Sequence, residues 1–237
     1  MSFLIKVLTT KLQKKEFSTF NTGEGMSLDS RPEWKKLHDE AEQLHDYSLS
    51  VKDRKIYLHS SYDSEDSDPG TDWRMANTFI KNIHILESFS DKPIEIHQFN
   101  IGGDEEAGYA IYDTIKYCRC PVTVITHGVA ASMGSIIPQA ADKRITMPSC
   151  CWLIHKGSTG IGHRDRIPAK QWAKWEDYCD KRMMFIYAEA CSNSEAWSGK
   201  DTASIMGSMN KMLNAKGDWF MNATEAVQYG FCDEVFE

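Results

Sequence analysis

The sequence predicts an α/β fold built around a largely parallel β-sheet. Strand-like and helix-like segments alternate from residue 55 to residue 155, which is the pattern of βα units. The strand-like segments are rich in β-branched residues, most clearly PVTVIT at 121–126. The chain has 237 residues, of which 41% are hydrophobic and 26% are charged. It can therefore bury a core of its own as one α/β domain with additions.

Local patterns predict the elements of the first two thirds of the chain. A helix opens at Pro32 and continues through Tyr47. Apolar side chains recur every three or four residues from 72 to 89, which predicts a second helix. The other expected elements are a helix at 105–117 and strands at 55–59, 93–99, 121–126, 143–147 and 150–155.

Helices dominate the expected structure of the last third. A long helix follows Ile167 and ends near Cys191, and another spans about 200–214. The last helix begins at Asn222, because Asn222 and Glu225 have the spacing of a capping box, and Gly230 is a suitable helix end.

Charge and hydropathy exclude two classes of partner. The formal net charge is −7, and binding of phosphates requires clustered Lys and Arg, so no nucleic acid is expected. The chain has no run of 18 apolar residues and no signal-peptide cleavage site near its N-terminus. We therefore expect no membrane partner.

The cysteines indicate a reducing environment. Their number is odd and their spacing irregular, which argues against a disulfide framework, and the spacing is not that of a zinc site. We expect structural thiols in a cytoplasmic protein, without a metal ion or other cofactor. The seven cysteines are at positions 118, 120, 150, 151, 179, 191 and 232.

The segment GVAASMG at 128–134 is a candidate nucleophile turn. A serine between small residues, after a strand and at the start of a helix, can expose its hydroxyl beside the N–H groups of a helix N-terminus. The same pattern also occurs in turns that only pack closely. His155, at the end of a strand, is a candidate general base, although a hydrogen-bonded structural histidine would have the same pattern. Spacing alone does not select a carboxylate among 34 acidic residues.

Four segments, in the same order and at similar spacing, resemble the ClpP serine peptidases. The resemblance is strongest over about 93–157 and 218–233, and a looser match begins near residue 52. The four segments are IGGDEEAGYAIYDTIK at 101–116, GVAASMG at 128–134, WLIHKG at 152–157 and DWFMNATEAVQYGFCD at 218–233.

This resemblance implies a fold and an activity. The fold is the ClpP/crotonase-like spiral of ββα units with a helical handle extension at about 168–191, in a peptidase domain at 51–237 that follows an appendage at 1–50. The activity is that of a serine endopeptidase that cleaves peptides or unfolded proteins through an acyl-enzyme.

The resemblance also implies the site residues. Ser132 is the nucleophile, His155 the general base and acid, and Asp218 the residue that orients the histidine. The backbone N–H groups of Gly103 and Met133 form the oxyanion hole. A glycine at 103 suits this role because the peptide has to approach the substrate carbonyl closely.

Family members assemble as homo-oligomeric rings, heptamers or double heptamers, and cellular members are fed by AAA+ ATPases. The resemblance therefore implies a ring and an ATPase partner. The chain departs from the family pattern at Ile101, at Lys156-Gly157 and at Gly217, where the family commonly has proline, Gln-Pro and arginine. These departures favour the hypothesis of a specialised, phage-type member.

Three alternatives remain open at the level of sequence. The chain could be a catalytically inactive ClpP-like ring subunit, or an acyl-CoA enzyme of the crotonase class, which also has an oxyanion hole. A Ser–Lys peptidase like SppA would use Lys143 or Lys156 as its base.

Overall fold

The computed structural model of the protein describes residues 32–59, 70–157 and 166–237. The chain divides into two units, Met1–His38 and Asp39–Glu237. The first turns of helix α2 lie in the first unit, and every described strand lies in the second.

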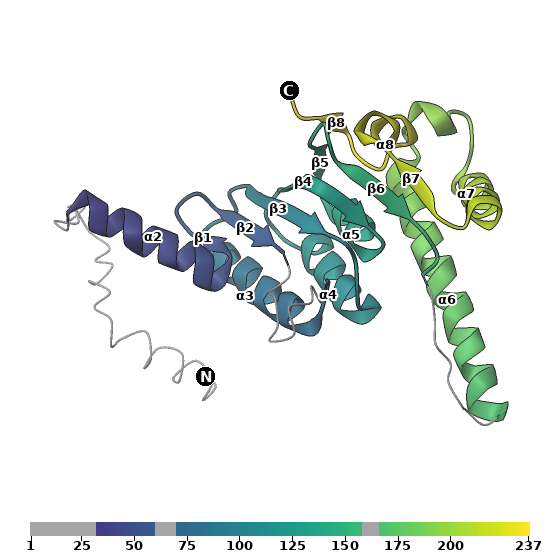
Figure 1. Ribbon diagram of the computed structural model, residues 1–237, viewed down its shortest axis with the longest axis horizontal. Helices are drawn as coiled ribbons and strands as arrows, with labels where there is room; N and C mark the ends of the chain where they lie inside the picture. Colours follow the sequence, from purple (N-terminus) through teal and green to yellow (C-terminus); the bar gives the residue numbers. More distant parts are fainter. Residues whose placement is uncertain (1–31, 60–69, 158–165) are drawn as a thin grey trace. The chain divides into compact units, whose positions relative to one another are not determined.

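The predicted α/β fold with a mainly parallel sheet is confirmed (Figure 1). The described strands follow the order β1-β2-β3-β4-β5-β8, and β6 pairs with both β4 and β7. Neighbouring pairs are parallel except β1–β2 and β6–β7. The strands are β1 (Leu49–Ser50), β2 (Lys55–Leu58), β3 (Ile94–Asn100), β4 (Val122–Ala131), β5 (Lys143–Thr146), β6 (Cys151–Ile154), β7 (Trp219–Met221) and β8 (Glu234–Val235).

The described helices lie close to the ranges expected from the sequence. Side-chain caps at Asp72, Asp104, Asp201 and Asn222 begin four of them, and the predicted capping box of Asn222 and Glu225 is confirmed. The α-helices are α2 (Glu33–Tyr47), α3 (Trp73–Phe89), α4 (Glu105–Lys116), α5 (Met133–Ile136), α6 (Arg166–Cys191), α7 (Thr202–Lys216) and α8 (Ala223–Tyr229), and the 3₁₀ helices are η1 (Ile137–Ala140) and η2 (Glu195–Trp197).

Strand β4 is longer than the sequence predicted. The expected strand ended at residue 126, but β4 continues to Ala131. Its first half pairs with β5 and its last three residues pair with β6. Between the halves, Gly128 has φ 59° and lies so close to the Phe99 ring that a Cβ would be 2.5 Å from Phe99 Cε2. A glycine is therefore needed where β4 changes partner.

Helices α3 and α4 lie side by side along one face of the sheet (Figure 1). Phe79 and Ile83 of α3 pack in one buried cluster with Ile111 of α4 and with Ile96 and Val124 of the sheet. Each such side chain contributes on the order of 1.5–3 kcal/mol when it is fully buried. This cluster holds α3, which precedes β3, and α4, which follows the turn after β3, against the sheet.

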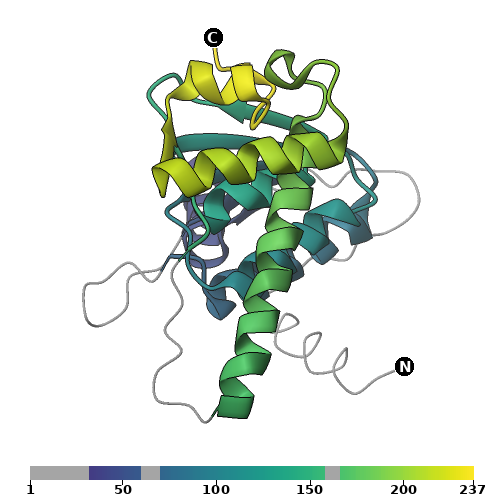
Figure 2. The same ribbon diagram turned by 90° about the vertical axis from the view of Figure 1, so that its right-hand side faces the viewer.

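A second cluster joins α6 and α7 to the pair β6–β7. Trp152 of β6 and Trp219 of β7 are buried there with Tyr187 of α6 and Phe231. Figure 2 shows α7 crossing α6 near the C-terminal end of α6. Of the helices in the described residues, none has the length and apolar character of a membrane span.

Helix α6, the predicted handle, changes character along its length. Trp172 and Trp175 in its first half are 38% and 45% exposed, whereas Met183, Met184 and Tyr187 in its second half are buried. The second half belongs to the core and the first half presents aromatic side chains to solvent.

A chain of ionisable side chains crosses strands β2, β3 and β4. Lys55 Nζ lies 2.7 Å from Glu95 Oε1, and His97 Nε2 lies 2.7 Å from the same oxygen. His97 Nδ1 is 3.0 Å from His127 Nε2. The His97 ring stacks between Tyr57 and His127, with centroids at 4.9 and 5.2 Å. The hydrogen bond between the two histidines needs one nitrogen without a proton, so it is lost when both rings are charged.

We predict that this pair makes the stability of the protein depend on pH. Burial, and to a lesser extent the charge of His97, lowers the pKa of His127 below its ordinary value of 6.5. The unfolded chain then binds more protons than the folded one. The contribution of His127 to the free energy of unfolding is therefore fully present above about pH 6.5 and is lost as the pH falls through the folded pKa of His127. Urea unfolding at several pH values between 7.5 and 5 measures the slope of the free energy of unfolding against pH.

The replacement His127→Gln should flatten this slope, and His84→Gln, at an exposed position on α3, is the matched control. An unchanged slope in His127→Gln would show that His127 is not its source.

Candidate active site

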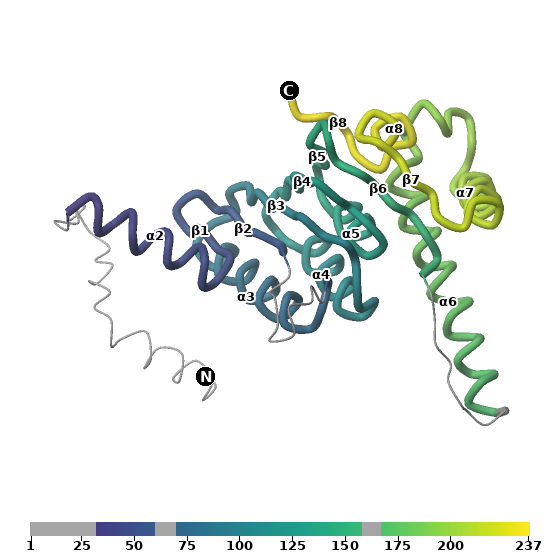
Figure 3. The backbone as a smooth tube through the Cα atoms, viewed as in Figure 1, coloured from purple at the N-terminus to yellow at the C-terminus, as the bar shows by residue number. Residues whose placement is uncertain are grey.

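Ser132 and His155 follow the ends of adjacent parallel strands. Strand β4 ends at Ala131, which pairs in register with Leu153 of β6. Ser132 comes directly after β4, and His155 comes directly after β6. Because parallel strands end at the same edge of a sheet, both residues lie at that edge, where ligands of α/β proteins bind. The tube in Figure 3 shows β3, β4, β6 and β7 in succession.

Asp218 reaches the same edge through an antiparallel strand. Ile154 of β6 pairs with Trp219 of β7, so the residue after β6 lies beside the residue before β7. These residues are His155 and Asp218, and His155 Nδ1 lies 3.5 Å from Asp218 Oδ1. The side chains are 29% and 57% exposed. The structure therefore brings the predicted base and carboxylate together.

The second ring nitrogen of His155 has no hydrogen-bond partner in the part of the chain that the structure describes. Nε2 is buried and makes no hydrogen bond with any described residue. The Ser132 hydroxyl is therefore at the same edge as the imidazole but is not hydrogen-bonded to it.

The backbone of Ser132 is strained. It has φ 54° and ψ −125°, a conformation that non-glycine residues rarely adopt. The Ser132 N–H donates to Leu153 O at 3.0 Å, and Ser132 O accepts from the Ser135 N–H at 2.9 Å and from Ser135 Oγ at 2.6 Å. Ser132 lies in a sharp turn between β4 and α5 and is partly exposed.

The small residues around the turn are required by close backbone approaches. A Cβ on Gly134 would lie 2.3 Å from Asn100 O, and one on Gly102 would lie 2.5 Å from Ser132 Cβ and 3.1 Å from Met133 N. Both distances below 3 Å exclude a side chain. The glycines thus allow the end of β3 to touch the nucleophile turn.

The double glycine holds one N–H group away from its partner strand. Thr71 forms a parallel bridge with Gly103, in which the Thr71 N–H donates to Gly102 O at 2.6 Å and Thr71 O accepts from the Asp104 N–H at 2.7 Å. In such a bridge the N–H of the central residue points away from the partner strand. The Gly103 N–H therefore faces away from Thr71. Met133 is the first residue of α5, where helix N–H groups are free to bind an anion.

Asn100 supports the double glycine and was missed by the sequence analysis. Its side chain is buried, and Oδ1 accepts from the Gly102 N–H at 2.8 Å and from Thr71 Oγ1 at 3.0 Å. The only sequence signal was a polar residue at the junction between a predicted strand and the double-glycine segment.

The second half of α6 also contacts the start of α4, which the sequence analysis did not foresee. Arg182 Nη2 lies 3.2 Å from Glu105 Oε1, and its guanidinium carbon lies 3.4 Å from the centre of the Tyr109 ring. An ion pair and a cation–π contact thus join the two helices.

Neither lysine of the Ser–Lys alternative is placed as a base. Lys143 begins β5 opposite Thr123, near the start of β4 and so at the opposite edge from Ser132, and its Nζ is 2.9 Å from Glu234 Oε1. Lys156 Nζ is 3.4 Å from Asp180 Oδ2. Both ammonium groups are engaged in ion pairs with carboxylates.

Two of the buried cysteines are poorly suited to act as a rival nucleophile. All seven are free thiols. Burial raises the pKa of Cys179 to about 11 and that of Cys232 to about 12. Such thiols stay protonated near neutral pH and are poor nucleophiles.

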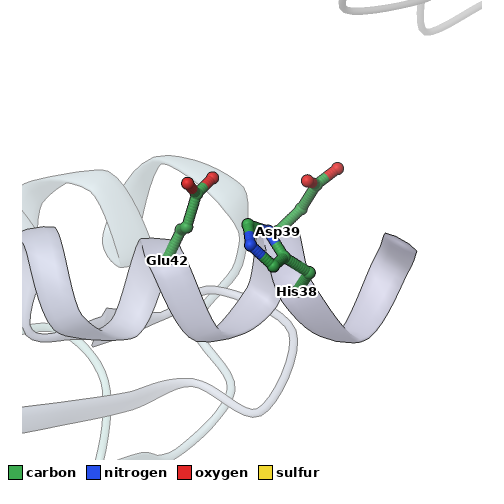
Figure 4. A group of neighbouring side chains, drawn as sticks. All are labelled: His38, Asp39 and Glu42. Carbon is green, nitrogen blue, oxygen red and sulfur yellow. The ribbon is translucent and has the colours of Figure 1, made fainter. Parts of the chain in front are cut away.

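One further group of ionisable side chains lies on α2. His38, Asp39 and Glu42 place potential ligand atoms within 4.8 Å of one another (Figure 4). They occupy adjacent positions of one helix and are exposed or partly exposed. This is the ordinary arrangement of polar residues on a solvated helix face, and we assign no function to it.

Comparison with known proteins agrees with the resemblance found in the sequence. A sequence model of the Clp protease family matches residues 39–237. The ATP-dependent Clp protease proteolytic subunit 2 of Pseudomonas aeruginosa is 30% identical over 198 residues, which cover 81% of this chain and 85% of that protein. The proteolytic subunit of Deinococcus radiodurans is 30% identical over 198 residues, 81% and 84% of the two chains. That of Lactococcus lactis is 33% identical over 199 residues, 81% and 87%.

We predict opposite effects of alanine at two helical glycines. Gly134→Ala should lower the free energy of unfolding by about 1–3 kcal/mol, because the new methyl group meets Asn100 O. Gly207→Ala, in α7 with no atom near the new methyl group, should raise it by about 0.5–1 kcal/mol. Urea unfolding monitored by circular dichroism compares them. Equal changes in the free energy of unfolding of the two variants would mean that β3 lies farther from the turn than the structure shows.

Proposed function

Because the chain belongs to the Clp protease family, it is a ClpP-like serine peptidase, and we propose that Ser132, His155 and Asp218 are its catalytic triad. The observation that carries the assignment is the register of β4, β6 and β7, which delivers the three residues to one sheet edge with His155 Nδ1 3.5 Å from Asp218 Oδ1.

In the proposed mechanism, Ser132 Oγ attacks the substrate carbonyl while His155 Nε2 accepts its proton. Asp218 stabilises the resulting imidazolium through Nδ1. The oxyanion of the tetrahedral intermediate accepts hydrogen bonds from the N–H groups of Gly103 and Met133. His155 then protonates the leaving amine, and the acyl group remains on Ser132 until water, activated by the same imidazole, hydrolyses the ester.

The unpartnered Nε2 of His155 supports this role. A buried ring nitrogen without a hydrogen bond is costly and is rare in structures. In ligand-free sites the catalytic hydrogen bonds are often long and tighten when substrate binds. A substrate that closes the site would bring the serine hydroxyl to this nitrogen.

A catalytically inactive ring subunit is the second candidate. The observation that favours it is the missing hydrogen bond between Ser132 and His155. Labelling of the serine separates the two candidates.

We further propose the setting of the activity. The relatives are named ATP-dependent Clp protease proteolytic subunits, and we infer a homo-oligomeric ring, heptameric or double heptameric, that cleaves peptides or unfolded proteins and works with an AAA+ ATPase. Residues 1–50 would be an appendage to the peptidase domain. The seven free thiols support a cytoplasmic location.

We predict that a fluorophosphonate probe labels Ser132. Ser132→Ala should abolish labelling, and His155→Ala should slow both labelling and peptide hydrolysis by at least about 10⁴-fold, because the serine loses its base. Mass spectrometry of the adduct identifies the labelled residue. Ser149→Ala, at an exposed serine, is the control. Absence of labelling in a folded, assembled sample would favour the inactive subunit.

Native mass spectrometry tests the proposed assembly. We expect a species of seven or fourteen subunits, and Ser132→Ala should leave its mass distribution unchanged, because the serine side chain is not expected at a subunit contact. A monomer under these conditions would contradict the ring.

A further inference from the structure

Two buried hydroxyl groups connect the long helix α6 to the nucleophile turn. Tyr187 of α6 is 1% exposed, and its OH lies 2.8 Å from Ser135 Oγ. Ser135, in α5, is fully buried, and its Oγ lies 2.6 Å from Ser132 O. The phenol, the serine hydroxyl and the backbone carbonyl of the nucleophile thus form one continuous series of hydrogen bonds.

The direction of this series follows from proton counting. A serine hydroxyl has one proton, and the carbonyl oxygen of Ser132 can only accept, so Ser135 Oγ donates to it. The Tyr187 hydroxyl must then donate to Ser135 Oγ. Burial raises the pKa of Tyr187 well above its ordinary value of 10.0, so the phenol keeps the proton that it donates. Each oxygen in the series has a defined role.

The carbonyl at the end of the series belongs to a strained residue. Ser132 has φ 54° and ψ −125°, and its carbonyl receives two hydrogen bonds from Ser135, one from Oγ and one from the N–H at 2.9 Å. Rotation of ψ toward a relaxed conformation would turn the carbonyl away from both donors. The two bonds therefore oppose relaxation of the turn.

Packing alone does not explain the Tyr187 hydroxyl. The ring meets Phe231 edge to face, with centroids 5.3 Å apart, and a phenylalanine would make the same contact. A hydroxyl buried among apolar side chains is unfavourable unless it is hydrogen-bonded. Its presence at this position therefore points to the bond with Ser135.

We propose that Tyr187 and Ser135 are positioning residues for the nucleophile. Resting on the triad proposed above, the inference is that Tyr187 orients the Ser135 hydroxyl, that Ser135 holds the Ser132 carbonyl, and that the strained turn thereby keeps Ser132 Oγ facing the site. Helix α6 sets the reactivity of the serine through this series, without touching substrate.

The test replaces one oxygen at a time. Tyr187→Phe keeps the ring and its contact with Phe231, and Ser135→Ala removes the hydroxyl donor to Ser132 O but keeps the N–H donor. Each should lower kcat for a peptide substrate, and the rate of fluorophosphonate labelling, by about three- to tenfold, the factor expected for the loss of one hydrogen bond. KM should change less than twofold, because neither residue contacts substrate.

Tyr109→Phe is the matched control. Tyr109 is also buried, at 6% exposure, and its hydroxyl has no hydrogen-bond partner among the described residues. This variant should keep kcat. The double variant Tyr187→Phe/Ser135→Ala should be no slower than Ser135→Ala alone, because the two hydroxyls act in series.

Three outcomes would overturn the inference. They are unchanged kcat in Tyr187→Phe, equal losses in Tyr187→Phe and Tyr109→Phe, and effects that multiply in the double variant. Thermal unfolding of each variant verifies that it is folded at the assay temperature. Ser132→Ala in the same assay keeps the two proposals apart. Full activity in Ser132→Ala would refute the triad, whereas an inactive Ser132→Ala beside a fully active Tyr187→Phe would refute the positioning role alone.

Discussion

The turn between β4 and α5 holds a serine in a backbone conformation that it adopts only under constraint. A residue in such a region costs on the order of 1–3 kcal/mol, and each hydrogen bond that opposes relaxation contributes about 0.5–1.5 kcal/mol net. Ser132 has three such bonds, one to Leu153 and two from Ser135. Their sum is comparable to the strain, so the turn depends on all of them. Strand β6 supplies the acceptor and α5 the donors, which means that sheet pairing and helix formation must both be complete before the hydroxyl is correctly placed.

The same constraint determines how the rest of the edge is built. The end of β3 passes so close to the turn that Gly102 and Gly134 leave no room for a methyl group. Asn100 then satisfies the Gly102 N–H with its side chain, which fixes the loop that carries Gly103. On the other side of the turn, β6 and β7 pair antiparallel, so the residue that precedes β7 lies beside the residue that follows β6. Four backbone segments meet at this edge because the registers of the paired strands agree.

Sequence patterns predicted what local interactions determine. The capping box that begins α8 and the β-branched first half of β4 depend on neighbouring residues, and both were found where they were expected. The turn at Ser132 was predicted from its small neighbours. Composition and spacing did not single out Asp218, because it precedes a strand of three residues that is too short to show a pattern, and only the family resemblance indicated it. Nor could they predict the contact of Tyr187 with Ser135, since 52 residues separate the partners and only tertiary packing brings them together.

Helix α6 contributes both to the hydrophobic core and to the exposed surface of the protein. Its second half is locked in the core by Met183, Met184 and Tyr187, and it reaches α4 through Arg182. Because an α-helix without a kink is stiff over this length, the direction of its exposed first half is fixed by the packing of the buried second half. The side chains that hold the nucleophile turn therefore also help to set the direction of the exposed first half of α6, where Trp175 lies. A substitution that disturbs this packing should alter the active site and the exposed half of the helix together, whereas a change confined to the first half leaves the hydrogen bonds at Ser132 in place.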